Sequence, residues 1–390
     1  MNAKEQPDTI HSWEKVIFGV PLSELPTLIP GLVAVTVLTW ISLRTSEWIG
    51  IQLMGFEKSP VSAVMVAIIL GLLIGLIVKL PKSLTPGLKF TVKKVLRLGI
   101  ILLGIRLTVF DVLRLGIFGI PIVALCIIGA LLITTFINNR LKLPERLGTL
   151  IAVGTSICGV TAIVAASPAI DAEEEESAYA VTVITIFGLF ATLVYPYLAN
   201  AIFSGGALQS GMFLGTSVHE TAQVVGAGQI YADVYSQPVA LDVATVTKLV
   251  RNVFMALVIP FMAYYYARKA RLKDGQFHGK RTSFSKLFPM FILGFLLMAI
   301  LRSIGDAGIN SGGLAYGVWD IGTWDQIIAS IKQWAEIFLV AALAAVGLNT
   351  NFRSFSALGA KPFLVGLGAS LAVGVVSYFA IQLFGGLVTF

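Results

Sequence analysis

Apolar segments long enough to cross a lipid bilayer follow one another along almost the whole chain. A membrane-spanning helix needs about 20 mostly apolar residues, and its backbone polar groups must be satisfied within the segment. We therefore expect an all-α polytopic membrane protein with about 10 to 11 transmembrane helices. The expected spans are 26–43, 61–80, 95–113, 117–138, 147–168, 179–201, 212–228, 239–266, 287–301, 327–347 and 362–387.

The composition agrees with a membrane protein, because 56% of the residues are hydrophobic and 13% are charged. A soluble domain usually carries about twice that share of charge. We expect residues 1–25 to form a cytoplasmic N-terminal segment without a signal peptide, and 26–390 to form a single transmembrane transporter domain. Cys126 and Cys158 have no metal-like spacing and are expected to be small buried hydrophobes. No metal and no cofactor is expected.

The distribution of Lys and Arg predicts the orientation. They gather in three short segments, 79–97, 140–146 and 268–286, and short basic loops stay in the cytoplasm. The expected spans between these segments are even in number, which predicts a multi-pass protein of the bacterial inner membrane with a cytoplasmic N-terminus and an external C-terminus. The acidic run at 171–176 is then expected to be an external, solvated loop. The net charge of +7 follows from this topology and implies no nucleic-acid partner.

Charged residues inside the expected spans cost more free energy in a membrane than any other feature of the chain. Lys248 and Arg251 stand three apart within the apolar stretch 239–266, so a helix carries both on one face. A basic side chain at membrane depth costs about 2.5 to 3.5 kcal/mol and normally has a negative partner. That partner is either a carboxylate of this chain or an anionic cargo. Arg106, with Asp111 five residues on, is expected to have a structural role, by snorkelling or by pairing locally.

Two expected spans share the sequence Gly-Thr-Ser, at 154–156 and 215–217. Many secondary transporters consist of repeats whose matching segments contain broken helices. Glycine permits unusual backbone dihedrals, and Thr or Ser can cap the amides of a following helix, so we expect two broken helices; the alternative is close helix packing through small residues. According to the number of expected spans, these two segments cross the membrane in the same direction. A weaker sequence similarity links 104–116 and 347–359, and those two segments cross in opposite directions. The repeat symmetry stays open: either one segment is re-entrant, or one of the two similarities is a coincidence.

Polar residues follow the second Gly-Thr-Ser sequence. Glu220 is expected to pair with a buried cation, to hold a coupling cation or to carry a proton. A histidine with an unshifted pKa titrates near neutral pH, so His219 is a candidate proton relay, with a neutral, hydrogen-bonded histidine as the alternative. Gln223 completes the expected site for a coupling ion.

The three motifs carry a resemblance. Gly-Thr-Ser-Ile-Cys-Gly-Val-Thr-Ala-Ile from Gly154, Gly-Thr-Ser-Val-His-Glu-Thr-Ala-Gln from Gly215 and Thr-Lys-Leu-Val-Arg-Asn from Thr247 resemble the YeiH-type sulfate exporter family over nearly the whole chain. The resemblance implies a bacterial plasma-membrane permease, distantly similar to bile acid/sodium symporters. In their crossing helix a Gln follows a sodium-binding Glu by four positions, whereas Gln223 follows Glu220 by three.

We therefore expect a secondary active transporter, not an enzyme, that exports a small inorganic or organic anion, such as sulfate, sulfite or an organosulfonate, by alternating access. The first alternative is a symporter of an organic anion coupled to Na⁺ or H⁺. The remote alternative is an intramembrane serine hydrolase with Ser156 as nucleophile and His219 as base. A homo-oligomer is left open. The residues expected to bind the substrate are Thr155, Ser156, Thr216, Ser217, Lys248 and Arg251, and those expected to handle the coupling ion are His219, Glu220 and Gln223.

Overall fold

The computed structural model describes residues 20–56, 59–272, 279, 287–350 and 360–387, and over these residues it contains helices and no strands. Within this described part of the chain, seven helical segments are long and apolar enough to cross a membrane. These findings confirm the predicted all-α polytopic membrane protein. Most of the expected N-terminal segment 1–25 and the 351–359 part of the weaker repeat lie outside the described residues.

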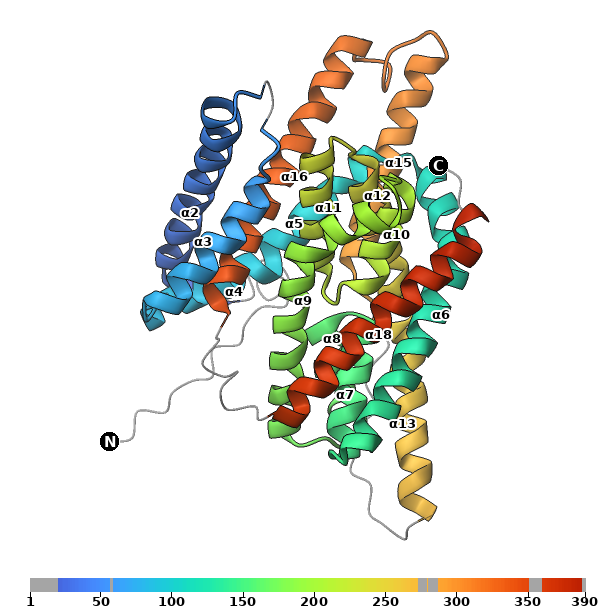
Figure 1. Cartoon of the computed structure of the whole chain (residues 1–390). Coiled ribbons are helices and arrows are strands. Elements are labelled where there is room, and N and C mark those ends of the chain that lie inside the picture. Colours follow the sequence, from blue (N-terminus) through green and yellow to red (C-terminus); the bar gives the residue numbers. More distant parts are fainter. Residues whose placement is uncertain (1–19, 57–58, 273–278, 280–286, 351–359, 388–390) are drawn as a thin grey trace, which may run out of the picture.

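The helices form two bundles that pack side by side (Figure 1). We call the first the panel bundle; it contains α2 (Ile29–Glu47), α3 (Ala63–Ile77), α4 (Thr85–Phe90), α5 (Leu96–Leu103), α15 (Phe291–Asn310) and α16 (Ile321–Asn349). The second, the core bundle, contains α6 (Val109–Leu141), α7 (Glu145–Ser156), α8 (Gly159–Ala166), α9 (Glu174–Ile202), α10 (Ala207–Ser217), α11 (Thr221–Tyr235), α12 (Val239–Val253), α13 (Met255–Leu272) and α18 (Ala360–Phe384).

Glycine contacts join the helices of the panel bundle. A Cβ on Gly71 of α3 would lie 3.0 Å from the Cα of Gly347 in α16, and a Cβ on Gly31 of α2 would lie 2.7 Å from the Cα of Gly87 in α4. Small residues allow backbones to approach closely where lipid gives no hydrophobic driving force between helices. The two glycine pairs therefore bring the backbones of α3 and α16, and of α2 and α4, close together.

The first Gly-Thr-Ser segment belongs to a re-entrant hairpin. Helix α7 ends at Ser156, the chain reverses at Ile157 and Cys158, and α8 runs back along α7. Arg146 at the start of α7 forms an ion pair of 3.2 Å with Asp171, which follows α8. The hairpin therefore enters and leaves the molecule at the same face.

The second Gly-Thr-Ser segment forms a matching hairpin from the opposite face. Helix α10 ends at Ser217, and α11 begins at Thr221 and returns toward the end of α9. Tyr231 near the end of α11 donates a hydrogen bond of 3.1 Å to Asn200 near the end of α9. Because the hairpins enter from opposite faces, the two segments are inverted, and the parallel arrangement from the span count was wrong.

The re-entrant hairpins correct further expectations. The acidic run lies on the face of Arg146 rather than opposite it, and it is not a loop: Glu173 caps α9, whose first turn contains Glu174–Glu176. The expected spans 95–113 and 117–138 also had the wrong boundary. Thr108 and Asp111 form a capping box that starts α6, so the chain turns at 104–108.

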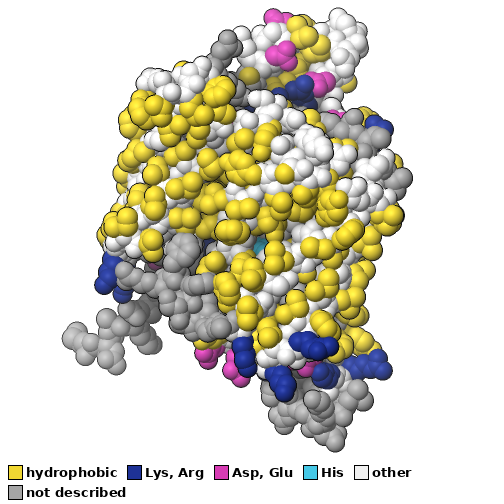
Figure 2. All heavy atoms as spheres, viewed as in Figure 1, with side chains coloured by type: hydrophobic (Ala, Val, Ile, Leu, Met, Phe, Trp, Pro, Cys, Tyr) yellow, Lys and Arg dark blue, Asp and Glu magenta, His cyan; other side chains and the backbone are white. Residues whose placement is uncertain are grey.

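Lys and Arg residues gather at one end of both bundles (Figure 2). We call this end the basic face; its described residues include Lys79, Lys82, Lys89, Arg140, Lys142, Arg146, Arg268 and Lys269. The predicted basic segments therefore share one face, to the extent that they are described. The exposed apolar side chains form the belt between this face and the other end.

Cysteine labelling tests the two hairpins. In a variant without Cys126 and Cys158, we expect Cys at exposed Arg140 and Glu175 to react with a membrane-impermeant thiol reagent from one side of the membrane, and Cys at exposed Ser204 and Ser236 from the other. Labelling of positions 140 and 175 from opposite sides would show that α7 and α8 together cross the membrane.

Candidate functional site

The two hairpin tips meet in the core bundle, where Arg251 of α12 joins them. Its guanidinium donates to the carbonyl oxygens of Ser156 (2.6 Å) and Thr155 at the end of α7. It also donates to the carbonyl oxygens of Thr216 (2.6 Å) and Val218 (3.0 Å) at the end of α10. Arg251 is fully buried, so these carbonyl groups take the place of water around its charge.

Lys248 binds the same tips one helical turn away. Its ammonium donates to the carbonyl oxygens of Ile157 (2.8 Å), Val218 (3.1 Å) and His219, and the side chain is fully buried. An ammonium has three donors, and all three are directed at carbonyls. Among the described residues no carboxylate forms an ion pair with either cation, so the first expected partner is not found there. The second alternative, an anionic cargo, stays a prediction.

The physical basis of this arrangement is the negative end of a helix. The last carbonyl groups of α7 and α10 have no partner within their helices and carry a partial negative charge of about 0.5 at each end. Two cations supply donors to both ends at once. A mid-membrane break that would otherwise leave orphaned carbonyls is thereby satisfied, and the costly cations of α12 acquire partners.

The Gly-Thr-Ser side chains do not act as expected. They precede the break, and none caps the following helix, because Ser156 donates to the carbonyl of Val153, Thr216 to that of Met212 and Ser217 to that of Phe213. Thr155, Ser156, Thr216 and Ser217 are fully buried and do not line a described cavity. The predicted breaks are present, but their main-chain carbonyl groups, rather than their hydroxyls, contact the cations.

Glu220 occupies the other ends of the broken helices. It is the N-cap of α11: its carboxylate accepts from the amide of Gln223, and it is also hydrogen-bonded to the amide of Val160 in the first turn of α8. A Cβ at Gly159 would lie 2.4 Å from Cγ of Glu220, and Gly159 has a φ of +50°, so only glycine suits this contact. One carboxylate therefore lies where the positive ends of two helices meet.

Gln223 and His219 are bound within the protein. The side-chain oxygen of Gln223 accepts from the amide of Glu220 (3.2 Å), and its amide donates to the carbonyl of Thr185 (3.2 Å). Nε2 of His219 lies 2.7 Å from the hydroxyl of Ser370 on α18. The serine hydrolase alternative requires a hydrogen bond between Ser156 and His219, but each of these side chains is bonded to another residue. The roles of His219 and Gln223 with a coupling ion stay predictions.

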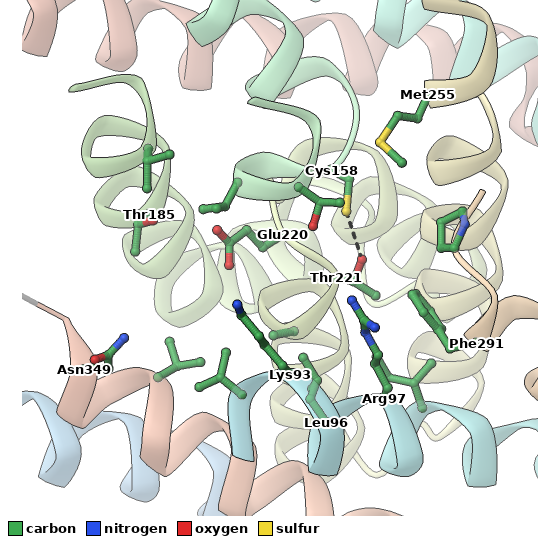
Figure 3. A pocket seen from close by; sticks show the side chains of 18 of the residues that line it. Lys93, Leu96, Arg97, Cys158, Thr185, Glu220, Thr221, Met255, Phe291 and Asn349 are labelled. Atoms are coloured by element: carbon green, nitrogen blue, oxygen red, sulfur yellow. Dashed lines mark hydrogen bonds between the residues drawn. The ribbon is translucent and has the colours of Figure 1, made fainter. Parts of the chain in front are cut away.

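A cavity of about 660 Å³ lies between the two bundles, beside the hairpin tips. Glu220 lines it from the core bundle, and Lys93 and Arg97 reach toward it from the panel bundle (Figure 3). Its lining also includes Thr161, Thr182, Thr185, Thr221, Asn349 and Thr350. Because Phe288–Phe291 and the end of α16 contribute to the wall, the cavity lies toward the basic face. It combines two cations, a carboxylate, hydroxyls and the amide end of α8.

Lys93 and Arg97 are functional candidates that the sequence did not reveal. Both side chains are exposed, and they lie four residues apart on one face of a segment that contains a π-helical turn, Thr91–Val95. The sequence interpretation treated them as part of a basic loop. One sequence signal could have identified them. Lys93 lies just before the apolar stretch that begins at Leu96, and Arg97 lies just inside it, and a charge within or at the edge of a membrane segment is often functional.

A part-buried ion pair joins the bundles on the side away from the basic face. Arg106, at the end of the segment that continues α5, donates a hydrogen bond of 2.5 Å to Asp242 of α12, and Glu336 of α16 lies 3.9 Å from Arg106. The amide of Val109 in α6 also donates to the hydroxyl of Ser303 in α15 at 2.8 Å. Arg106 therefore forms a structural ion pair, but with a distant residue rather than locally as expected, and Asp111 caps α6.

The chain matches the family model described as conserved hypothetical protein 698 over residues 30–366. It is 30% identical over 319 residues to a UPF0324 membrane protein of Fusobacterium nucleatum, covering 81% of this chain and 89% of that relative. It is 32% identical over 356 residues to one of Clostridium tetani (89% and 95%), and 31% identical over 349 residues to one of Corynebacterium glutamicum (88% and 89%). No solved structure matches the chain significantly.

Replacement of Arg251 tests its part in holding the hairpins. We expect Arg251→Ala to lower the free energy of unfolding by about 3 to 5 kcal/mol, because it leaves several buried carbonyls without donors. Arg251→Lys, which keeps the charge but has fewer donors, should fall between this variant and the wild type. The control is Arg44→Ala, since Arg44 forms an exposed pair with Glu47. Thermal unfolding in detergent measures the difference, and equal melting temperatures for Arg251→Ala and Arg44→Ala would contradict the role.

Proposed function

The chain belongs to the family of conserved hypothetical protein 698, whose relatives here are UPF0324 membrane proteins, and from this premise we propose that it is a secondary transporter of a small anion. The observation that supports this best is the cavity between the bundles, where the N-terminal ends of α8 and α11, both capped by Glu220, lie beside two cations. Transporters commonly place their substrate where broken helices meet near the bilayer midplane. A channel or scaffold does not need this combination.

The cargo is proposed to bind between Lys93, Arg97 and the first turn of α8. A guanidinium and an ammonium provide charge-assisted hydrogen bonds to an anion, and helix amides add further donors. The volume of about 660 Å³ falls within the range of small-molecule sites, about 300 to 1,000 Å³. Sulfate, sulfite and small organosulfonates have the charge and the acceptor oxygens that such a site selects. Lys248 and Arg251 would act mainly by fixing the hairpins and by their positive field.

The two-bundle architecture supports alternating access. The cavity lies at the bundle interface toward the basic face, and the Arg106–Asp242 pair joins the same two bundles on the other side. Movement of the core bundle relative to the panel bundle would separate this pair and close the cavity. We propose that the pair is the gate on that side, and that this structure is open toward the basic face.

The orientation follows from the positive-inside rule. If the basic face is cytoplasmic, then the protein lies in a bacterial inner membrane with its N-terminus inside and its C-terminus outside, and the open cavity faces the cytoplasm. Loading from the cytoplasm suits an exporter, although the gradients of cargo and coupling ion set the direction of net transport. Coupling to H⁺ is the second candidate, and the position of Glu220 favours it over coupling to Na⁺, because the oxygen of Gln223 is already used within the protein.

Replacement of the cavity cations tests the cargo site. We expect Lys93→Gln and Arg97→Gln each to reduce anion exchange in proteoliposomes about tenfold or more, since a hydrogen bond to a charged group contributes about 1.5 to 3 kcal/mol. The probes are sulfate, sulfite, thiosulfate and taurine, tested separately. Lys89→Gln is the matched control, because Lys89 is exposed on the same segment outside the cavity lining. Full exchange by both cavity variants would disprove the site.

Weakening of the ion pair tests the gate. In a variant that lacks Cys126, we expect Asp242→Asn to speed modification of Cys158, which lines the cavity, from the side opposite the basic face by about fivefold or more, as a loss of about 1 kcal/mol predicts. The control is Asp306→Asn, which removes the Arg302–Asp306 pair within α15 and leaves the contacts between bundles intact. Unchanged modification of Cys158 in Asp242→Asn would show that the pair is not the gate.

A further inference from the structure

Glu220 already holds the place that an anion would take. Its carboxylate accepts from the amide of Gln223 in α11 and is hydrogen-bonded to the amide of Val160 in α8. Each helix N-terminus carries a partial positive charge of about 0.5, so two of them together roughly balance one carboxylate. The pair of helix ends therefore attracts an external anion strongly only when Glu220 is neutral or displaced.

One oxygen of Glu220 is available for a proton. Among the described residues, buried Oε1 has no hydrogen-bond partner, and the side chain faces the cavity (Figure 3). A protonated carboxyl donates a hydrogen bond from one oxygen, whereas an ionised carboxylate only accepts. A neutral Glu220 could thus donate to an oxyanion in the cavity, while the charged form repels it.

The charged and titratable groups around Glu220 come from four elements. Lys93 of the π-helical turn Thr91–Val95 and Arg97 of α5 face it across the cavity, and Cys158 in the turn before α8 lines the same cavity. On its other side, Lys248 of α12 is bound to the carbonyl of His219, the residue before Glu220. The only carboxylate that lines this cavity within the described part of the chain is Glu220, so a proton that accompanies an anion into it has one carboxylate to bind.

We propose that Glu220 is the proton site that couples anion transport to H⁺, an inference that depends on the proposed function. In the loading conformation a proton from water binds a carboxylate oxygen of Glu220, and the anion then binds to Lys93, Arg97 and the released helix amides. Proton and anion move together, and the proton returns to water when the anion leaves on the other side. By linkage, each of the two ligands raises the affinity of the other by the same factor.

Proteoliposomes test the coupling with sulfate and thiosulfate as probes, because neither titrates in the range of about pH 5 to 8 in which the assay runs. For the wild type we expect anion uptake to rise as the loading side is acidified and to be accompanied by proton movement, read with an enclosed pH dye. Glu220→Gln, a neutral mimic of the protonated state, should retain anion exchange within about threefold, lose the pH dependence and move no protons. The control is Glu175→Gln, at an exposed site on the basic face, which should behave as the wild type.

The outcomes separate two failures. If the wild type exchanges neither anion, then the proposed function fails for these cargoes and the coupling fails with it. If the wild type transports but Glu220→Gln keeps its pH dependence and proton movement, then only the coupling site is wrong. If Glu220→Gln melts like the wild type yet exchanges nothing, then the carboxylate is needed in its charged form, which also overturns the proposal.

A measurement on the wild type alone covers the case in which Glu220→Gln does not fold. Addition of sulfate or thiosulfate to the purified protein in weak buffer at about pH 6 to 7 should cause uptake of up to about one proton per bound anion, read with a pH dye. Binding of the anion without proton uptake would overturn the proposal.

Discussion

Two buried cations on the carbonyl ends of two broken helices are the interaction on which the rest of the structure depends. A cation in a membrane segment and an unpaired carbonyl at a mid-membrane helix break are each costly alone. Lys248 and Arg251 donate charge-assisted hydrogen bonds to the carbonyl groups of both hairpin tips, so the cations and the carbonyl groups satisfy each other. This explains why both cations can be fully buried with no carboxylate partner in the described structure, and why one face of α12 holds α7 and α10 in place.

The orientation of the hairpins follows from this interaction. Because the negative ends of α7 and α10 point at α12, the positive ends of α8 and α11 are left at the other side of the tips, beside the interface with the panel bundle. Glu220 caps both of these ends, and Lys93 and Arg97 face them across the cavity. The core bundle thus carries a polar centre of its own. Besides apolar packing, the polar contacts between the bundles at the far face include the Arg106–Asp242 ion pair and the hydrogen bond from Val109 to Ser303.

The sequence predicted the helical membrane class, the two breaks and the cost of the α12 cations, because apolar length, Gly-Thr-Ser repetition and buried charge are local signals. It did not predict that each broken segment returns to its own face, since hydropathy measures length and polarity but not chain reversal. This one difference moved Asp171 to the basic face and inverted the two repeats. Lys93 and Arg97 were missed because the positive-inside rule explained them without a cavity. The Arg106–Asp242 pair spans 136 residues and requires the tertiary fold.

Hydrogen–deuterium exchange of the purified protein with and without anion tests the central claim most directly, namely that the cations hold the carbonyl ends so that the amide ends serve the cargo. The account predicts that a transported anion slows exchange in peptides that contain Gly159–Thr161 and the Lys93–Arg97 segment, and leaves the already protected end of α12 unchanged. A transported anion that protects neither of these segments, or that instead alters exchange around Lys248 and Arg251, would contradict it.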